Sequence, residues 1–201
     1  MNTPTPMHVQ PVTLSGRHVR LEPLSLGHVT ALAAVGLDPI LWRHVPTRMA
    51  SADDMRAYVE TALAEQARGV SLPFAIAEQA GGRVIGSTRY GNIVAEHRRL
   101  EIGWTWLTPA AQRTGANTEA KLLLLTHAFE TLGANRVELK TDALNAQSRA
   151  AILRIGAKEE GIFRQHMVIP GTGRIRDTVY FSIIRAEWPA VKANLEARLQ
   201  R

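Results

Sequence analysis

Residues 100–132 read LEIGWTWLTPAAQRTGANTEAKLLLLTHAFETL, and this stretch decides how the rest of the chain is interpreted. Its first eight residues alternate, which predicts a β-strand with one buried face. That face is expected to hold Leu100, Ile102, Trp104 and Trp106. After Pro109 a polar loop over residues 112–117 leads into a helix, which the apolar spacing predicts from about Thr118 to Leu132. Asn117 or Thr118 is placed to cap that helix.

The loop before the helix has the composition of an anion site. A helix N-terminus presents unpaired N–H groups and a partial positive charge, which attract phosphate. Gly115 allows close approach of an anion and permits a positive φ, and Arg113 adds a cation. A strand, a glycine-bearing loop and a helix therefore predict a pyrophosphate cradle. An ordinary strand-to-helix connection with a turn glycine fits the same residues, because one glycine is a weak signal.

Three segments together resemble the GNAT N-acetyltransferase superfamily. Residues 112–117, QRTGAN, look like its Q/R-x-x-G-x-G/A acyl-CoA loop, with Asn117 where Gly or Ala is commonest, and the preceding strand resembles its fourth strand. Residues 141–148, TDALNAQS, followed by Ile155-Gly156-Ala157, are similar to its strand–Asn-x-x-Ser–helix segment. Residues 16–24 resemble its first strand. The likeness covers about residues 14–186, and the branch most resembled is RimJ/RimL, which acetylates α-amino groups of ribosomal proteins.

The resemblance implies an enzyme that moves an acyl group from acetyl-CoA to an amine acceptor, either a protein N-terminus or a small molecule. Succinyl-CoA stays open as a donor, and homodimers are frequent in the family. Asn145 is implied to contact the pantetheine arm and Ser148 to lie near the leaving sulfur. The other cofactor-binding residues implied are Trp104, Trp106 and Leu107 along the arm, and Gln112, Arg113, Thr114, Gly115, Ala116, Asn117 and Thr118 at the pyrophosphate.

Glu101 is the candidate general base, since a carboxylate can take the proton of the attacking amine directly or through water. Many superfamily members carry a tyrosine four positions after Ser148; Ile152 stands there in this chain, which excludes a tyrosine acid from that helix. Plainer roles fit the same residues. Glu101 could be a surface or cross-strand carboxylate, Asn145 a helix N-cap and Ser148 a first-turn serine.

The remaining sequence predicts one domain over residues 14–201, ending in an amphipathic helix, after a loose arm over residues 1–13. Its elements follow the order β-α-α-β-β-β-α-β-α-β-β, which mixes hairpins with crossover helices. The expected fold is therefore α/β, with a mixed, mostly antiparallel sheet of about seven strands flanked by helices. Residues 17–24 are expected to form an edge strand. Residues 42–49 are expected either to line the acceptor side, as in the family, or to form a packed inter-helix loop.

Composition narrows the classes of function. Apolar residues make up 45% of the 201, and the chain has no cysteine. No apolar run is long enough to span a bilayer, so membrane partners are not expected, and with no signal segment the cytoplasm is favoured. The net charge of +6 suits a polyanion such as CoA, whereas the low aromatic content of 5% argues against a nucleic-acid site. The histidines lack metal-ligand spacing, so no metal is predicted.

Three hypotheses follow from the sequence. The first is an acyl-CoA-dependent N-acyltransferase that works by direct attack of the amine in a ternary complex. The second is a non-catalytic CoA-binding sensor on the same fold. The third is a basic protein associated with RNA or the ribosome, for which the sequence offers only its net charge.

Overall fold

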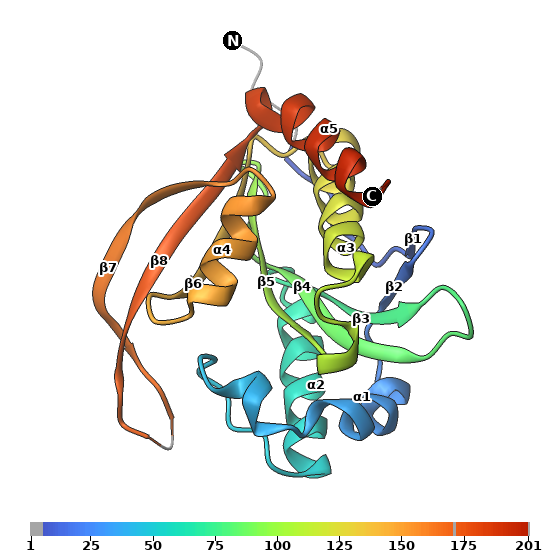
Figure 1. The fold of residues 1–201 in the computed structure, drawn as a ribbon, viewed down its shortest axis with the longest axis vertical. Coiled ribbons are helices and arrows are strands. Elements are labelled where there is room, and N and C mark those ends of the chain that lie inside the picture. The colour runs from blue at the N-terminus through green and yellow to red at the C-terminus, as the bar shows by residue number, and fades with distance from the viewer. Residues whose placement is uncertain (1–5, 171, 201) are drawn as a thin grey trace.

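An eight-stranded sheet runs through the computed structural model, which describes residues 6–170 and 172–200 (Figure 1). The strand order is β1-β2-β3-β4-β5-β6-β8-β7, and every neighbouring pair is antiparallel except β5 with β6. The predicted mixed, mostly antiparallel sheet is thus confirmed. The strands are β1 Leu14–Ser15, β2 Val19–Pro23, β3 Leu72–Glu78, β4 Val84–Val94, β5 Arg99–Leu107, β6 Arg136–Asp142, β7 Lys158–Val168 and β8 Ile175–Ile184.

Helices cover both faces of this sheet. The α-helices are α1 Val29–Gly36, α2 Ala52–Ala67, α3 Gly115–Thr126, α4 Ala146–Arg154 and α5 Trp188–Leu199. The short helices are η1 Leu26–His28, η2 Pro39–Trp42, η3 Pro109–Ala111, η4 His127–Thr131 and η5 Arg185–Glu187. Helices α1 and α2 pack on one face, whereas α3, α4 and α5 pack on the other, and the β7–β8 hairpin extends away from the body (Figure 1).

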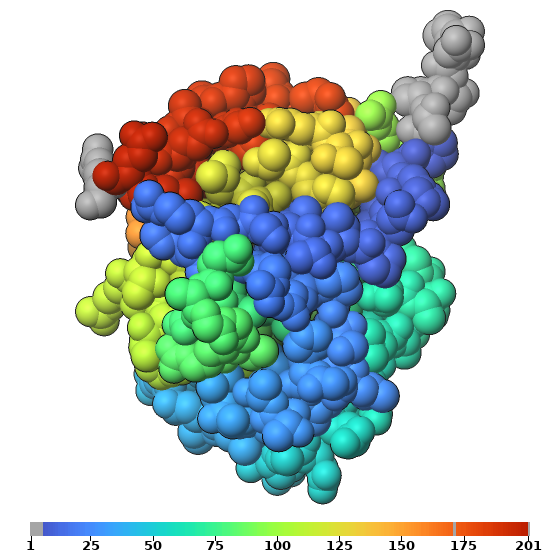
Figure 2. Space-filling view, turned by 90° about the vertical axis from the view of Figure 1, so that its right-hand side faces the viewer, coloured from blue at the N-terminus to red at the C-terminus, as the bar shows by residue number. Residues whose placement is uncertain are grey.

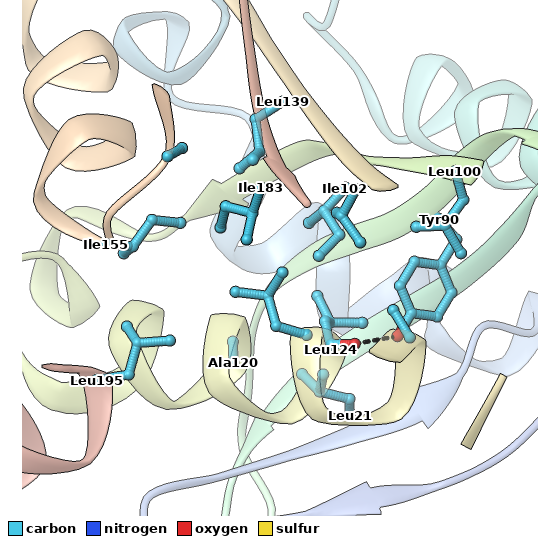
Figure 3. Packing of buried hydrophobic residues seen from close by; sticks show 14 of the residues in the cluster. Leu21, Tyr90, Leu100, Ile102, Ala120, Leu124, Leu139, Ile155, Ile183 and Leu195 are labelled. Atoms are coloured by element: carbon cyan, nitrogen blue, oxygen red, sulfur yellow. Dashed lines mark hydrogen bonds between the residues drawn. The ribbon is translucent and has the colours of Figure 1, made fainter. Parts of the chain in front are cut away.

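The larger hydrophobic core lies between the sheet and α3, α4 and α5. Leu124 of α3 is fully buried among residues of β2, β5, β6 and β8 (Figure 3). Beside it the Tyr90 hydroxyl donates a 2.6 Å hydrogen bond to the Leu124 carbonyl. A buried hydroxyl must find such a partner, because leaving it unpaired costs about 1–3 kcal/mol. This core fixes α3, and hence its N-terminus, against the sheet.

A β-bulge in β5 divides the strand between the two faces. Gly103 pairs with Arg89 and Trp106 pairs with Ser87. Between these two pairs β5 therefore contains one residue more than β4. Trp104 takes up the extra residue with a φ of 50°. The prediction that Leu100, Ile102, Trp104 and Trp106 share one face is therefore wrong. The first two belong to the α3 side and the two tryptophans to the α1–α2 side.

Helix α3 begins at Gly115, three residues earlier than predicted, and Thr114 caps it. The Thr114 hydroxyl accepts a hydrogen bond from the Ala116 N–H at 3.1 Å. The expected caps Asn117 and Thr118 lie inside the first turn instead. The left-handed residue of the loop is Arg113, with a φ of 60°, whereas Gly115 does not use a positive φ. The glycine serves packing, since a Cβ there would lie 3.2 Å from the His18 ring.

The N-terminal segment lies along the body of the protein. In Figure 2 it runs, in dark blue, between the face formed by α3 and α5 and the face formed by α1 and α2. Met7 is buried and donates its N–H to the Ala95 carbonyl at 3.2 Å. Strand β1 pairs with β2, so the predicted edge strand is not at the edge. Of the predicted loose arm, residues 1–5 lie outside the described range.

Candidate functional site

The parallel ladder between β5 and β6 is short, and its end defines the candidate site. The strands pair only at three positions, the last of which joins Glu101 to Glu138. The β5 residues beyond Glu101 have no partner on β6, and the bulge at Trp104 lies within this unpaired stretch. Main-chain groups on that edge of β5 are therefore left for another partner, such as an extended chain placed between the strands.

The N-terminus of α3 lies just beyond the end of β5 and presents free amides. Thr114 uses its hydroxyl twice, accepting from the Ala116 N–H and donating to the Ala111 carbonyl at 2.8 Å. The main-chain N–H groups of Arg113, Thr114 and Gly115 donate to no group within residues 6–170 and 172–200. Three adjacent free amides at the positive end of a 12-residue helix form a geometry that suits an anion.

Strand β2 is tied to the second turn of α3. Glu119, only 5% exposed, accepts main-chain N–H bonds from Arg17, His18 and Val19 at 2.8, 2.6 and 2.7 Å. The bonds hold His18 against Gly115, which explains why that position carries no side chain. Sequence analysis missed Glu119, because in a helix predicted to begin at Thr118 it would lie in the first turn, where a carboxylate normally serves only the helix dipole.

Helix α4 forms the other side of the opening. Gln112 bridges to it, since its Nε2 donates to the Leu107 carbonyl at 3.0 Å and its Oε1 accepts from Gln147 at 3.2 Å. Asn145 caps α4, accepting from the Ser148 N–H at 3.0 Å, so the N-cap role is confirmed. The Asn145 Nδ2 and the Ser148 hydroxyl contact no polar partner in the described part of the chain.

Glu101 lies where β5 and β6 part. Its side chain is 8% exposed, and Oε2 accepts from Asn92 Nδ2 at 2.6 Å and pairs with Lys140 Nζ at 2.9 Å. Both contacts use Oε2, whereas Oε1 lies beside Gly103, at the start of the unpaired stretch. Glu101 is therefore a buried, cross-strand carboxylate with one oxygen still able to accept a proton or a hydrogen bond.

Lys140 links Glu101 to β8. Its ammonium lies 4.7 Å from the Tyr180 ring centroid, a cation–π distance. Burial works to lower the pKa of Lys140, but the Glu101 carboxylate outweighs it, and the pKa ends above its ordinary value. Lys140 is thus positively charged at neutral pH. A row of charged and polar side chains consequently leads from the opening of the ladder onto the surface of β8.

The tryptophans of β5 have separate environments. Trp106 is 5% exposed and packs 5.5 Å from Trp42, with Tyr58 beyond it. Its side chain is therefore part of the α1–α2 core. Trp104 is half-buried, and its ring lies 4.9 Å from the Arg89 guanidinium. The Trp42 indole N–H donates to the Gly36 carbonyl at 2.7 Å. At Trp42 the segment between α1 and α2 is therefore packed, which matches the expectation of a packed inter-helix loop.

Lys121 is a buried lysine that sequence analysis missed. It is 7% exposed, lies on the inner face of α3, and donates to Thr105 Oγ1 at 2.8 Å. Thr105 in turn contacts Thr88 at 2.7 Å, so the chain of hydrogen bonds reaches the bulge of β5. Burial lowers the pKa of Lys121 to about 7, although Glu101 opposes that shift. The helical spacing of apolar neighbours gave no sign of this environment.

The arrangement combines free amides for an anion, an unpaired strand edge and a carboxylate at the opening. Among the described residues no group of three or more Asp, Glu or His side chains could hold a metal ion. In that same part of the chain, no helix is both long and apolar enough to cross a membrane. Part of the chain's positive charge is internal, since Arg89 is 2% exposed and paired with Glu65.

Comparison with known families decides the class. Residues 18–158 match the model described as "Acetyltransferase (GNAT) domain". The chain belongs to this family. It is 35% identical over 111 residues to the Bacillus subtilis (strain 168) protein named "Putative ribosomal N-acetyltransferase YdaF"; the match covers 55% of this chain and 59% of that one. The matched family model describes an acetyltransferase domain, and the relatives that match are named N-acetyltransferases.

Solved structures agree on the fold. A GCN5-related N-acetyltransferase from Brucella melitensis has a TM-score of 0.89 and 33% identity, with 97% of this chain and 89% of that chain covered. Mycobacterium smegmatis RimJ in complex with CoA-disulfide has a TM-score of 0.80 and 23% identity, with 94% of this chain and 95% of that chain covered. At that identity the likeness concerns the fold alone. The GNAT resemblance drawn from the sequence is confirmed by the family model, and the match to a relative named as a ribosomal N-acetyltransferase agrees with the RimJ/RimL branch.

Proposed function

We propose that this GNAT protein is an acyl-CoA-dependent N-acyltransferase that uses acetyl-CoA as its donor and a primary amine as its acceptor. The observation that carries the proposal is the conjunction of the free amides at residues 113–115 with the end of the β5–β6 ladder. A thioester carrier has a diphosphate for the first feature and an extended amide-bearing arm for the second. The RimJ structure with bound CoA-disulfide, on the same fold, supports this assignment.

The residues present fit such a ligand. The diphosphate would accept hydrogen bonds from the amides of Arg113, Thr114 and Gly115, and the Arg113 side chain is exposed beside them. Residues 116–118 follow in the same helical turn. Asn145 Nδ2 is placed to donate to the arm while its Oδ1 caps α4. The predicted cap and the predicted arm contact therefore use different atoms of one side chain.

The reaction needs a neutral amine, a polarised carbonyl and a stabilised thiolate. Glu101 Oε1 is the proposed acceptor of the amine proton, directly or through water, while Asn92 and Lys140 hold Oε2. The unpaired N–H groups of β5 are proposed to polarise the thioester carbonyl. The Ser148 hydroxyl is proposed to donate to the leaving sulfur. The carbon–sulfur bond breaks as the new amide bond forms, and CoA leaves as the thiol.

One observation favours a second candidate. Glu101 already serves as the cross-strand ion-pair partner of Lys140, a structural role that needs no catalysis. A CoA-binding sensor that performs no transfer would have the same arrangement. The two candidates differ in turnover and share ligand binding.

Titration calorimetry and a thiol-release assay together test both. Acetyl-CoA is expected to bind the wild-type chain, whereas S-acetyl-pantetheine, which lacks the diphosphate, is expected to bind at least tenfold more weakly. Thiol release with a panel of amines is expected from the wild type and is expected to be at least about 100-fold slower in Glu101→Gln. Absence of acetyl-CoA binding at millimolar ligand would overturn both candidates. Tight binding with no turnover on any amine would favour the sensor.

A further inference from the structure

A second group of charged side chains lies where β6 ends and β8 begins, and the proposed acyl-CoA site does not use it. It consists of His44, Asp142, Arg174 and Arg176 and is called the β8 charge cluster below. His44 comes from the loop before α2, Asp142 ends β6, and the two arginines flank the start of β8. The Arg176 Nη1 lies 3.4 Å from the His44 carbonyl, so loop and strand are in contact.

Asp142 is already matched within the cluster. Its side chain is fully buried, Oδ1 accepts from the Leu144 N–H at 2.9 Å, and Oδ2 forms an ion pair with Arg174. Burial works to raise the pKa of Asp142, but the hydrogen bonds from Arg174 and Leu144 hold it below its ordinary value. Asp142 is therefore ionised at neutral pH, and Arg174 balances its charge.

Arg176 is the group left over. It is 7% exposed, and its Nε atom is buried without a hydrogen-bond partner among residues 6–170 and 172–200. His44 Nδ1, 3.9 Å from Asp142, is likewise buried and unpartnered in that part of the chain. The Asp142 carboxylate is paired with Arg174, and the described residues offer the Arg176 guanidinium no carboxylate of its own. A buried guanidinium with an unsatisfied donor is costly, and an anion supplied by a ligand would offset that cost.

The cluster lies on the same face of the sheet as the ion pair of the proposed base. Lys140 and Asp142 share one face of β6 and pair with Tyr180 and Thr178 of β8, and Arg176 lies two residues from Thr178 on that face. Lys140 lies between Glu101 and the Tyr180 ring. The cluster also opens to solvent, since the His44 and Arg174 side chains are 28% and 31% exposed. A small molecule or chain end with its amine at Glu101 could therefore extend toward Arg176.

Resting on the proposed function, we propose that Arg176, together with His44, binds a carboxylate of the amine acceptor. The chain would then prefer acceptors that carry a carboxylate near the amine over acceptors of equal size that do not. The bidentate geometry of guanidinium with carboxylate gives both affinity and orientation. A purely structural Arg176, which only holds the His44 loop in place, would give no such preference.

Matched acceptor pairs test this preference. Each pair differs only in carboxylate against carboxamide: β-alanine with β-alaninamide for free amino acids, and peptides that begin with Glu or with Gln for chain ends. For whichever class of acceptor the protein uses, free amino acids or chain ends, the wild type is expected to favour the carboxylate member of the pair about 10- to 100-fold in kcat/KM. Arg176→Gln is expected to bring the ratio near one, whereas the exposed-site control Arg56→Gln keeps it. A wild-type ratio near one in both arms, or an unchanged ratio in Arg176→Gln, overturns the proposal.

Further readouts separate this proposal from the proposed function. Arg176→Gln is expected to bind acetyl-CoA as the wild type does. If this variant fails to fold, Arg176→Lys replaces it; because lysine keeps the charge, that variant is expected to retain part of the preference for the carboxylate acceptor. If no amine is acylated, thermal denaturation in the presence of CoA decides. Carboxylate members are then expected to raise the Tm of the wild type and not of Arg176→Gln. No rise in the wild type overturns the carboxylate subsite even where acetyl-CoA binds.

Discussion

Replacing Glu119 with alanine should destabilise the protein more than any exposed substitution on α3. The carboxylate accepts three main-chain N–H bonds, from Arg17, His18 and Val19. The bond to Val19 is buried and the other two are partly buried, so water replaces the lost acceptor only in part. At about 1–3 kcal/mol for a buried unsatisfied donor, and less for the hydrated ones, Glu119→Ala should cost about 3 kcal/mol.

Equilibrium urea unfolding measures that loss, with Glu196→Ala on the exposed face of α5 as the control. For a chain of this size about 3 kcal/mol corresponds to a fall in Tm of roughly 6–12 °C. A second effect should follow from the same bonds, because they hold His18 against Gly115 in the proposed anion site. Acetyl-CoA binding should weaken as well. A free energy of unfolding within about 1 kcal/mol of wild type would refute the account of Glu119.

The other predictions concern three positions. Lys121→Met should stabilise the protein more at pH 6 than at pH 9. The folded pKa of Lys121, about 7, lies below the ordinary value of 10.5, so between these values the unfolded state binds more protons and the free energy of unfolding of the wild type rises by about 1.4 kcal/mol per pH unit. Equal stabilisation at both pH values would contradict the burial of a neutral lysine. Gly91→Ala should cost about 1–3 kcal/mol in urea unfolding, because its Cβ would lie 2.3 Å from the Trp104 ring, whereas Gly27→Ala should cost little. Glu101→Gln should lower kcat about 10²- to 10⁴-fold with acetyl-CoA affinity unchanged, and full activity would remove Glu101 from the reaction.

Much of the fold followed from local pattern. The strand predicted from residue 100 is observed as β5, and the helix predicted after the polar loop is observed as α3. What failed was the face of the tryptophans. One extra residue in β5 reverses side-chain direction, and a positive φ at Trp104 leaves no mark in the sequence.

The candidate site was predictable to a similar degree. The loop at residues 112–117 was found because a helix N-terminus is a local feature. Thr114 as the cap was missed because Asn117 and Thr118 have similar preferences for that position. Lys121 and Arg176 were missed for another reason, since their burial depends on elements distant in the sequence. No local spacing distinguishes them from solvated basic residues.

The most direct test of the central claim is to follow the backbone amide resonances of Arg113, Thr114 and Gly115 by NMR during titration with CoA. If these three amides hold the diphosphate, their signals should shift together and saturate with the binding isotherm, and pantetheine should leave them in place. Binding of CoA that moves signals elsewhere and leaves these three unchanged would contradict the account.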